Sequence, residues 1–163
     1  MLRDAELILR LGGFKHNNFT FSDLLVNENY KETINLYKYL ILNNDHIYII
    51  GNYRAKDSLF AKKNKFIPIR DNFFNCYDKQ LLEIQKKIKN IPSGSIIFCS
   101  ASSLTNIIGY NVWKKRQDVT LIDAGSSINF LLNLDGNRLY QTKYSSLYDI
   151  LTLKFLLNNK MRL

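Results

Sequence analysis

The sequence is poor in the residues that interrupt or cross-link a chain. Its 163 residues include only two prolines, seven glycines and two cysteines. The scarcity of proline and glycine argues against long structureless linkers. The cysteines, Cys76 and Cys99, lack the spacing of a metal site. We therefore expect two reduced, structural thiols in a cytosolic protein, without a disulfide.

Long apolar runs are also missing. No stretch approaches the length that a helix needs to cross a bilayer. The first residues, MLRDAELILRLGG, show neither a charged-then-apolar signal layout nor a small-residue cleavage site. These absences predict a cytoplasmic protein and leave open a peripheral contact with the inner face of the membrane.

Acidic residues are the third shortage. The chain has 14 Asp and Glu against 23 Lys and Arg, and its net charge is +9. Such a charge invites nucleic-acid binding. The lysines are scattered, however, with local runs only at 61–65 and 84–89, and the wealth of Asn, Lys, Ile and Tyr is typical of AT-rich coding. Nucleic acid is therefore disfavoured as a partner. A basic surface would equally attract sugar nucleotides, phosphorylated lipids or an anionic membrane face.

What the sequence does contain is an alternation of short apolar runs with longer amphipathic stretches. With 46% apolar residues, a chain of this length is expected to fold as one domain, 1–163, with a helical N-terminal part at 1–44 and a core at 45–163. Strands are expected at 46–52, 65–70, 95–101 and 119–125. Helices are expected at 4–11, 21–44, 77–91, 103–116 and 145–160. This order predicts a three-layer, Rossmann-like α/β fold with a mostly parallel sheet and helices on both faces.

Ligands of such sheets bind beyond the carboxyl ends of the strands. The rule points to the turns GNYR at 51–54, CSASS at 99–103 and DAGSS at 123–127. In the second turn, Ser100, Ser102 and Ser103 would let the backbone approach a ligand, and the helix that begins there would offer its free amides to an anion. An ordinary helix with Ser102 or Ser103 as its N-cap explains the same residues equally well. The sequence contains neither G-x-G-x-x-G nor a P-loop motif, so a standard dinucleotide or P-loop site is not supported.

The third turn places Asp123 at the end of a strand, followed by Gly125 and Ser126. An aspartate there could accept hydrogen bonds from sugar hydroxyls or act as a general base, or it could simply cap the amides of its own turn. Further along, Asn129 can donate and accept hydrogen bonds. Arg138 offers a planar fork for phosphate or carboxylate, and is otherwise a solvated surface charge.

Near the N-terminus, RDAE supplies two carboxylates, Asp4 and Glu6. On a loop, such a D-x-E pair could coordinate Mg²⁺ or Mn²⁺ bridging to a diphosphate. In a helix the two side chains would not share a face. The simpler interpretation is an acidic first turn that complements the helix dipole.

The order of these motifs resembles a known family. LLVNENY at 24–30, IYIIGN at 47–52, IPSGSIIFCSASSLTNIIGYNVWKK at 91–115 and LIDAGSSINFLL at 121–132, followed by Arg138 and Tyr140, are similar to a group of bacterial and viral glycosyltransferases with the D-type glycosyltransferase fold. The resemblance covers about 21–144. It implies transfer of a sugar from a nucleotide sugar to a glycan or other acceptor in surface polysaccharide assembly, with a divalent cation held by a D-x-E motif.

Carried over position by position, the family's C-terminal motif falls on Asp123, Gly125, Ser126, Arg138 and Tyr140, and Asn52 matches the asparagine that ends its first strand. The chain departs from the family where Ser102-Ser103 replaces a common Gly-Pro and where Asn129 replaces a common Asp. The family's D-x-E also lies far upstream, whereas Asp4 and Glu6 stand only about twenty residues before the VNENY segment. Because of these departures, a second hypothesis remains: the chain is a non-catalytic binding or partner module that retains the sheet without a complete donor site.

Overall fold

The computed structural model describes residues 29–62, 65–134, 151 and 155. The helix expected at 4–11, the first part of the helix expected at 21–44 and nearly all of the helix expected at 145–160 lie outside these residues. Within them, helix α2 runs over Tyr30–Asn43 and leads directly into the sheet.

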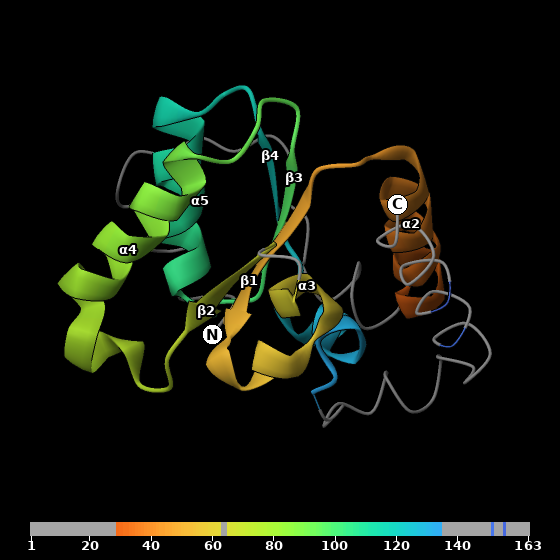
Figure 1. Cartoon of the computed structure of the whole chain (residues 1–163), viewed down its shortest axis with the longest axis horizontal. Coiled ribbons are helices and arrows are strands. Elements are labelled where there is room, and N and C mark those ends of the chain that lie inside the picture. The colour runs from red at the N-terminus through yellow and green to blue at the C-terminus, as the bar shows by residue number, and fades with distance from the viewer. Residues whose placement is uncertain (1–28, 63–64, 135–150, 152–154, 156–163) are drawn as a thin grey trace, which may run out of the picture.

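The centre of the fold is a parallel sheet of four strands (Figure 1). The strands are β1 (Ile47–Asn52), β2 (Phe66–Ile69), β3 (Ile96–Cys99) and β4 (Thr120–Asp123). Their order across the sheet is β2-β1-β3-β4, and every neighbouring pair is parallel. The α/β Rossmann-like fold predicted from the sequence is confirmed, and each predicted strand lies within two residues of its expected bounds at either end.

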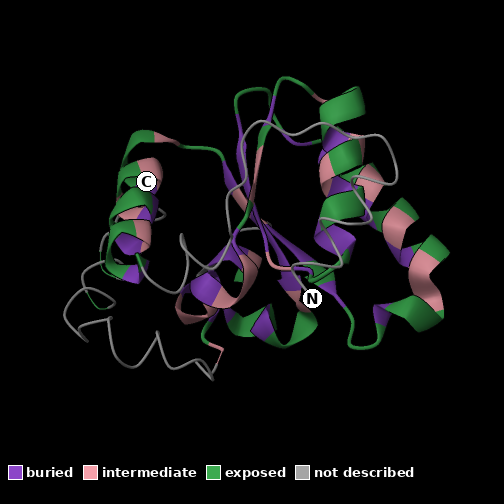
Figure 2. Cartoon of the chain, turned by 180° about the vertical axis from the view of Figure 1, so that it is seen from behind, coloured by how far each residue is buried: buried purple, intermediate pink, exposed green. Residues whose placement is uncertain are grey.

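Helices cover both faces of the sheet and complete the three layers (Figure 2). One face carries α2, α3 (Leu59–Lys62) and the 3₁₀ helix η4 (Gly125–Leu132), whose apolar residues pack with Ile49 and Phe98. The other face carries α4 (Tyr77–Lys89) and α5 (Leu104–Lys115), which pack on Ile50 and Ile97. The sheet is buried from both sides because its central strands are apolar without alternation, as expected for parallel strands.

The connection between β1 and β2 differs from the expectation. The sequence predicted one strand followed by another, with no helix between them. The structure instead has the 3₁₀ helix η2 (Tyr53–Asp57) and the short helix α3 in this position. Two parallel strands need a crossover that returns the chain to the starting edge of the sheet, and these two helices supply it. Their apolar residues, Ala55 and Phe60, are buried against the sheet.

Strand β2, which contains Pro68, is the outermost strand on its side of the sheet. Ile49 N–H donates to the carbonyl of Lys65, and this register turns the amide position of Pro68 away from β1. A proline is tolerated there because no ladder hydrogen bond is lost. Because Pro68 has no backbone N–H, the free edge of β2 has one hydrogen-bond donor fewer for another strand.

In the part of the chain that the structure describes, no helix has both the length and the apolarity to cross a membrane.

Candidate functional site

The strand order creates a topological switch point at the carboxyl edge of the sheet, the position of the ligand crevice in open α/β sheets. From β1 the chain moves to β2 on one side, then crosses back to β3 on the other side of β1. The carboxyl ends of β1 and β3 therefore flank the point where the direction of winding reverses, and this is where open α/β sheets bind ligands. The structure brings Asn52, Ser100 and Asp123 to this edge, at the ends of three adjacent strands.

At the end of β1, Asn52 belongs to a small polar cluster. Its Nδ2 donates to Asp71 Oδ1 at 2.8 Å, and its Oδ1 accepts the backbone N–H of Arg54 at 3.0 Å. Arg54 Nη2 donates to the other carboxylate oxygen of Asp71 at 2.5 Å. A side-chain interaction with Tyr53 and the negative charge of Asp71 raise the pKa of Arg54 above its ordinary value. The predicted site residue Asn52 is thus held in a fixed orientation by two charged neighbours.

The sequence analysis did not identify Arg54 or Asp71 as site residues. A signal for Asp71 was available, because it follows the strand at 65–70 as closely as Asp123 follows its own strand. The pairing itself joins residues 17 and 19 positions apart, and only the fold brings them together. The exposed guanidinium of Arg54 gives this edge of the sheet a planar cation.

The turn after β3 presents serine hydroxyls beside the start of α5. Ser102 has a left-handed backbone conformation (φ 51°), and Ser103 stands at the N-cap position without a side-chain capping bond. Within the described residues, no side-chain hydrogen bond engages the hydroxyls of Ser100, Ser102 or Ser103. Ser103 is thus the N-cap residue of α5, one of the two expected positions, although its side chain makes no capping hydrogen bond. All three hydroxyls are left for a ligand or for solvent.

A buried threonine holds this turn instead. Thr105 Oγ1 accepts the backbone N–H of Ala101 at 3.2 Å and the thiol of Cys99 at 3.5 Å. Cys99 is fully buried, and burial raises the pKa of its thiol to about 12. The expected inert, structural role of Cys99 fits this environment.

At the end of β4, Asp123 is exposed and lies next to Cys99 in the sheet register. Its Oδ1 accepts the backbone N–H of Gly125 at 3.2 Å, and Gly125 has a positive φ of 48° that favours glycine. The carboxylate thus caps its own turn, which was one of the two interpretations left open. The bond also orients the side chain at the carboxyl edge of the sheet, and a role of Asp123 toward a ligand stays a prediction.

The segment after Asp123 is not the simple turn that was expected. It forms η4, whose Ile128, Leu131 and Leu132 are buried against the sheet. Leu132 Cδ1 would stand 3.2 Å from a Cβ added at Gly51, so the glycine lets η4 pack closely over β1. Ser126 and Asn129 are half-buried in this helix. The carbonyl of Asn129 accepts the N–H of Leu134.

The remaining predicted site residues fall outside the described ranges: Arg138, Tyr140, Asp4 and Glu6. Among the residues that the structure does describe, no three His, Cys, Asp or Glu side chains gather in a way that could hold a metal ion. The structure therefore brings together Asn52, the three serines and Asp123, and leaves the expected cation ligands untested.

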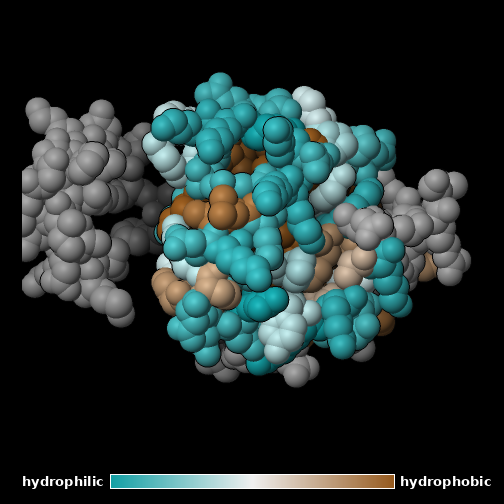
Figure 3. Space-filling model, turned by 60° about the vertical axis from the view of Figure 1, so that its left-hand side comes forward, coloured by the Kyte–Doolittle hydropathy of each residue, from teal (hydrophilic) through white to brown (hydrophobic). Residues whose placement is uncertain are grey.

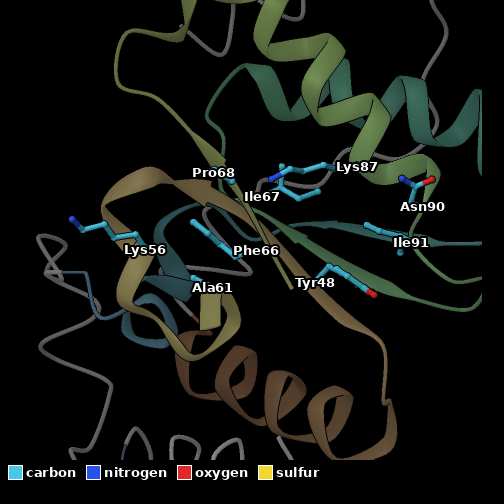
Figure 4. Close-up of a pocket in the computed structure, with 9 residues that line it drawn as sticks. All are labelled: Tyr48, Lys56, Ala61, Phe66, Ile67, Pro68, Lys87, Asn90 and Ile91. Carbon is cyan, nitrogen blue, oxygen red and sulfur yellow. The ribbon is translucent and has the colours of Figure 1, made fainter. Parts of the chain in front are cut away.

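A cavity of about 530 Å³ lies away from the crevice, around the outer edge of β2 (Figure 4). It has an apolar floor and a lysine on either side, and its lining residues are Tyr48, Lys56, Ala61, Phe66, Ile67, Pro68, Lys87, Asn90 and Ile91. No motif in the sequence pointed to this cavity, because its lining comes from five separate elements and from the connection after α4.

The site and fold define a Rossmann-like α/β protein with polar residues at the carboxyl ends of its strands. No protein-family model, no curated protein and no solved structure matches the chain.

Proposed function

We propose that the protein is a glycosyltransferase-like domain that transfers a sugar from a nucleotide sugar to a glycan or another acceptor, in surface polysaccharide assembly. The observation that carries the proposal is the row of polar groups at the carboxyl ends of β1, β3 and β4: Asn52, the hydroxyls of Ser100, Ser102 and Ser103, and Asp123. The motif resemblance described above supports the same function.

Asp123 is the proposed catalytic residue. Direct displacement at a sugar carbon needs a base that removes the proton of the acceptor hydroxyl as the new bond forms. Asp123 is exposed, and the Gly125 N–H engages only one of its two oxygens within the described residues. The other oxygen is available to accept the acceptor's proton or to orient its hydroxyl.

The leaving nucleoside diphosphate needs donors that stabilise its charge. The N-terminus of α5 supplies backbone amides and the positive end of a helix dipole, and the three serines add hydroxyl donors beside it. Asn52 and Arg54 stand at the neighbouring strand end. Arg138 and Tyr140 belong to the same proposal as substrate-binding residues, as do Gly125, Ser126 and Asn129.

A divalent cation, Mg²⁺ or Mn²⁺, completes the proposal. Such an ion would neutralise charge on the leaving diphosphate. Its proposed ligands are Asp4 and Glu6 of the D-x-E pattern, which lie outside the described residues, and the roles above are assigned without it.

Thermal melts with a panel of nucleotide sugars, with and without Mn²⁺, test the donor site. A ligand at a hundred times its dissociation constant stabilises a folded protein by about 2.7 kcal/mol, which a melt resolves. We expect one class of nucleotide sugar to raise the melting temperature. If no member of a panel covering uridine, guanosine and cytidine donors does so, the proposal is wrong.

An Asp123→Asn variant then separates binding from transfer. The variant should retain the donor-induced shift and lose transfer, measured as release of the nucleotide in the presence of an acceptor extract. Glu83→Gln is the matched control, because Glu83 is an exposed carboxylate on α4, away from the carboxyl end of β4. Full transfer activity in Asp123→Asn would remove Asp123 from the mechanism.

The alternative proposal is a non-catalytic binding or partner module. One observation favours it: the side chains of Asn52 and Asp71 already bond to one another at the end of β1. This alternative expects no shift of the melting temperature with any nucleotide sugar, and no transfer by the native chain. Transfer that depends on Asp123 excludes it.

A further inference from the structure

The outer side of α5 carries an exposed aromatic stripe. Ile107, Tyr110 and Trp113 have exposed fractions of 37%, 56% and 66%. They recur every third residue, on the side of the helix opposite to the buried residues that pack on the sheet. The rings of Tyr110 and Trp113 lie 6.0 Å apart between centroids, and Lys114 Nζ lies 5.8 Å from the centroid of Tyr110.

Positive charge surrounds this stripe. Helix α5 contains no acidic residue and ends in Lys114 and Lys115. The neighbouring helix α4 ends in three further lysines, Lys86, Lys87 and Lys89. Arg116, just after α5, donates to the carbonyls of Ile88 and Lys89, so the two lysine-rich ends lie side by side.

Helix α4 adds an apolar residue of its own to this outer surface, since Leu82 is 58% exposed. Figure 3 turns this side of the molecule toward the viewer and shows hydrophobic atoms reaching a mainly hydrophilic surface in separate patches. We call the outward side chains of the two helices, Leu82, Lys86, Tyr110, Trp113 and Lys114, the α4–α5 surface.

We propose that the α4–α5 surface docks on an anionic lipid bilayer. Trp and Tyr prefer the headgroup level of a membrane, where one part of the side chain is apolar and the other is hydrated. Lysines extend their stems along the apolar surface and keep their charge at the anionic headgroups. Stable attachment to a bilayer takes two signals, and this surface supplies both an apolar and a basic one.

The side chains favour lipid over nucleic acid as the partner. The cations of the α4–α5 surface are lysines, while Arg116, the planar guanidinium nearby, is bonded to Asp118 and to the carbonyls at the end of α4. Arginine is the preferred residue for phosphodiester recognition. Ile107 and Leu82 gain nothing from a phosphate backbone, but they lose water on entering a headgroup layer.

This inference stands apart from the proposed function. The lysine-rich ends of α4 and α5 lie at the amino edge of the parallel sheet, because both helices run from the carboxyl edge back to the start of the next strand. The crevice with Asn52 and Asp123 is at the other edge. A bilayer on the α4–α5 surface would therefore leave the crevice open, and either idea can fail without the other.

The test uses the intrinsic fluorescence of the full chain. Trp113 is the one tryptophan of the sequence, so its emission reports on this surface alone. The probe is a vesicle of phosphatidylcholine mixed with phosphatidylglycerol. We expect a blue shift of the emission, quenching by brominated acyl chains, and loss of both in high salt. Vesicles of phosphatidylcholine alone should give a much smaller effect.

Variants at exposed positions test whether the α4–α5 surface is the part of the protein that binds the vesicles. Lys114→Gln combined with Lys115→Gln should weaken binding to the anionic vesicles by about twenty-five-fold, since one lysine near an anionic membrane contributes a factor of about five. Tyr110→Ser should weaken it several-fold. Tyr39→Ser is the matched control, because Tyr39 is an exposed aromatic residue (64%) on α2, in the opposite layer, and should leave binding unchanged.

Several outcomes would overturn the proposal. The emission of Trp113 could stay unchanged while the protein sediments with vesicles, which would place the lipid contact elsewhere. A single-stranded oligonucleotide could shift the emission where vesicles do not, which would make the surface a nucleic-acid site. A shift that depends on protein concentration alone would make it a contact between copies of the chain.

Discussion

Two cysteines that look alike in the sequence have different chemical environments. Cys99 is fully buried in β3, and burial raises the pKa of its thiol to about 12, whereas Cys76 is half-buried at the end of the 3₁₀ helix η3 (Phe73–Cys76). The thiolate is the reactive form. We expect Ellman's reagent at mildly alkaline pH to modify Cys76 and to spare Cys99 until the protein unfolds.

The measurement counts the thiols that react in the native and in the denatured protein. Cys76→Ser should leave no fast-reacting thiol in the native state. Rapid reaction of that variant would show that β3 opens far more readily than its burial implies.

Ser127 shows how a residue beside a site can be structural. Its hydroxyl donates to the Ala124 carbonyl at 2.5 Å and accepts from the Tyr37 hydroxyl, also at 2.5 Å, with no exposed surface. We expect Tyr37→Phe and Ser127→Ala each to lower the free energy of unfolding by about 1 kcal/mol. Because the two share one hydrogen bond, the double variant should lose less than the sum of the two changes.

Urea unfolding of the two single variants and the double variant measures this coupling. Tyr39→Phe is the control, since Tyr39 lies on the exposed side of the same helix. Additive losses would mean that the Tyr37 hydroxyl does not bond to Ser127 in solution.

At the scale of elements, apolar runs predicted the strands well. Three of the four strands consist entirely or almost entirely of apolar residues, and a parallel strand buried on both faces leaves that pattern in any sequence. The short crossover between β1 and β2 was missed because 53–62 is too brief to show helical periodicity. Helix η4 was missed because Gly125, Ser126 and Ser127 were interpreted as a turn. The spacing of Ile128, Leu131 and Leu132 was the signal against that interpretation.

The candidate site was predictable only in part. The strand-end rule identified Asn52, Ser100 and Asp123, because it depends on chain order and not on distances. The contact of Asn52 with Asp71 and the capping role of Thr105 were not predictable, since they depend on which strands become neighbours and which side chain reaches the turn.

Arg116 links the end of α5 to the end of α4. Arg116 bonds to the carbonyls of Ile88, Lys89 and Ile91 at the end of α4, and its Nε and Nη2 bond to the carboxylate of Asp118. We expect Arg116→Ala to lower the free energy of unfolding by about 2 kcal/mol, since a charged donor leaves and helix-end carbonyls lose their partner. Lys115→Ala, at the exposed neighbouring position, should cost much less.

The ion pair between Arg116 and Asp118 should make the stability of the protein depend on pH. Hydrogen bonding to Arg116 lowers the pKa of Asp118 from 3.8 to about 2. A carboxylate with a depressed pKa stabilises the fold above its ordinary pKa, and that stabilisation is lost as the pH falls through its folded value. We expect urea midpoints of the native chain to fall between about pH 4 and pH 2, and to fall less in Asp118→Asn. Equal falls would mean that the pair does not form in solution.

Taken as a whole, the molecule is polarised along its strands. Hydroxyls, an amide and a carboxylate gather at the carboxyl edge of the sheet, while lysines from two helices gather at the amino edge. The parallel arrangement causes this division. All strands end at one edge, and the helices of the α4–α5 layer all end at the other, where basic residues complement the helix dipoles. Part of the net charge of +9 is thus concentrated at the amino edge of the sheet, away from Asn52 and Asp123.

The strand order also determines how the molecule opens. In β1 and β3, at the centre of the sheet, Ile49, Ile50, Ile97 and Phe98 have no exposed surface. Their amides should exchange with solvent only through global unfolding, as native-state hydrogen exchange by NMR would measure. At the outer strand β2, the register with β1 turns the Phe66 N–H outward and the Ile67 N–H inward. We therefore expect Phe66 to exchange orders of magnitude faster than Ile67. Equal protection of the two amides would mean that another segment pairs with the free edge of β2.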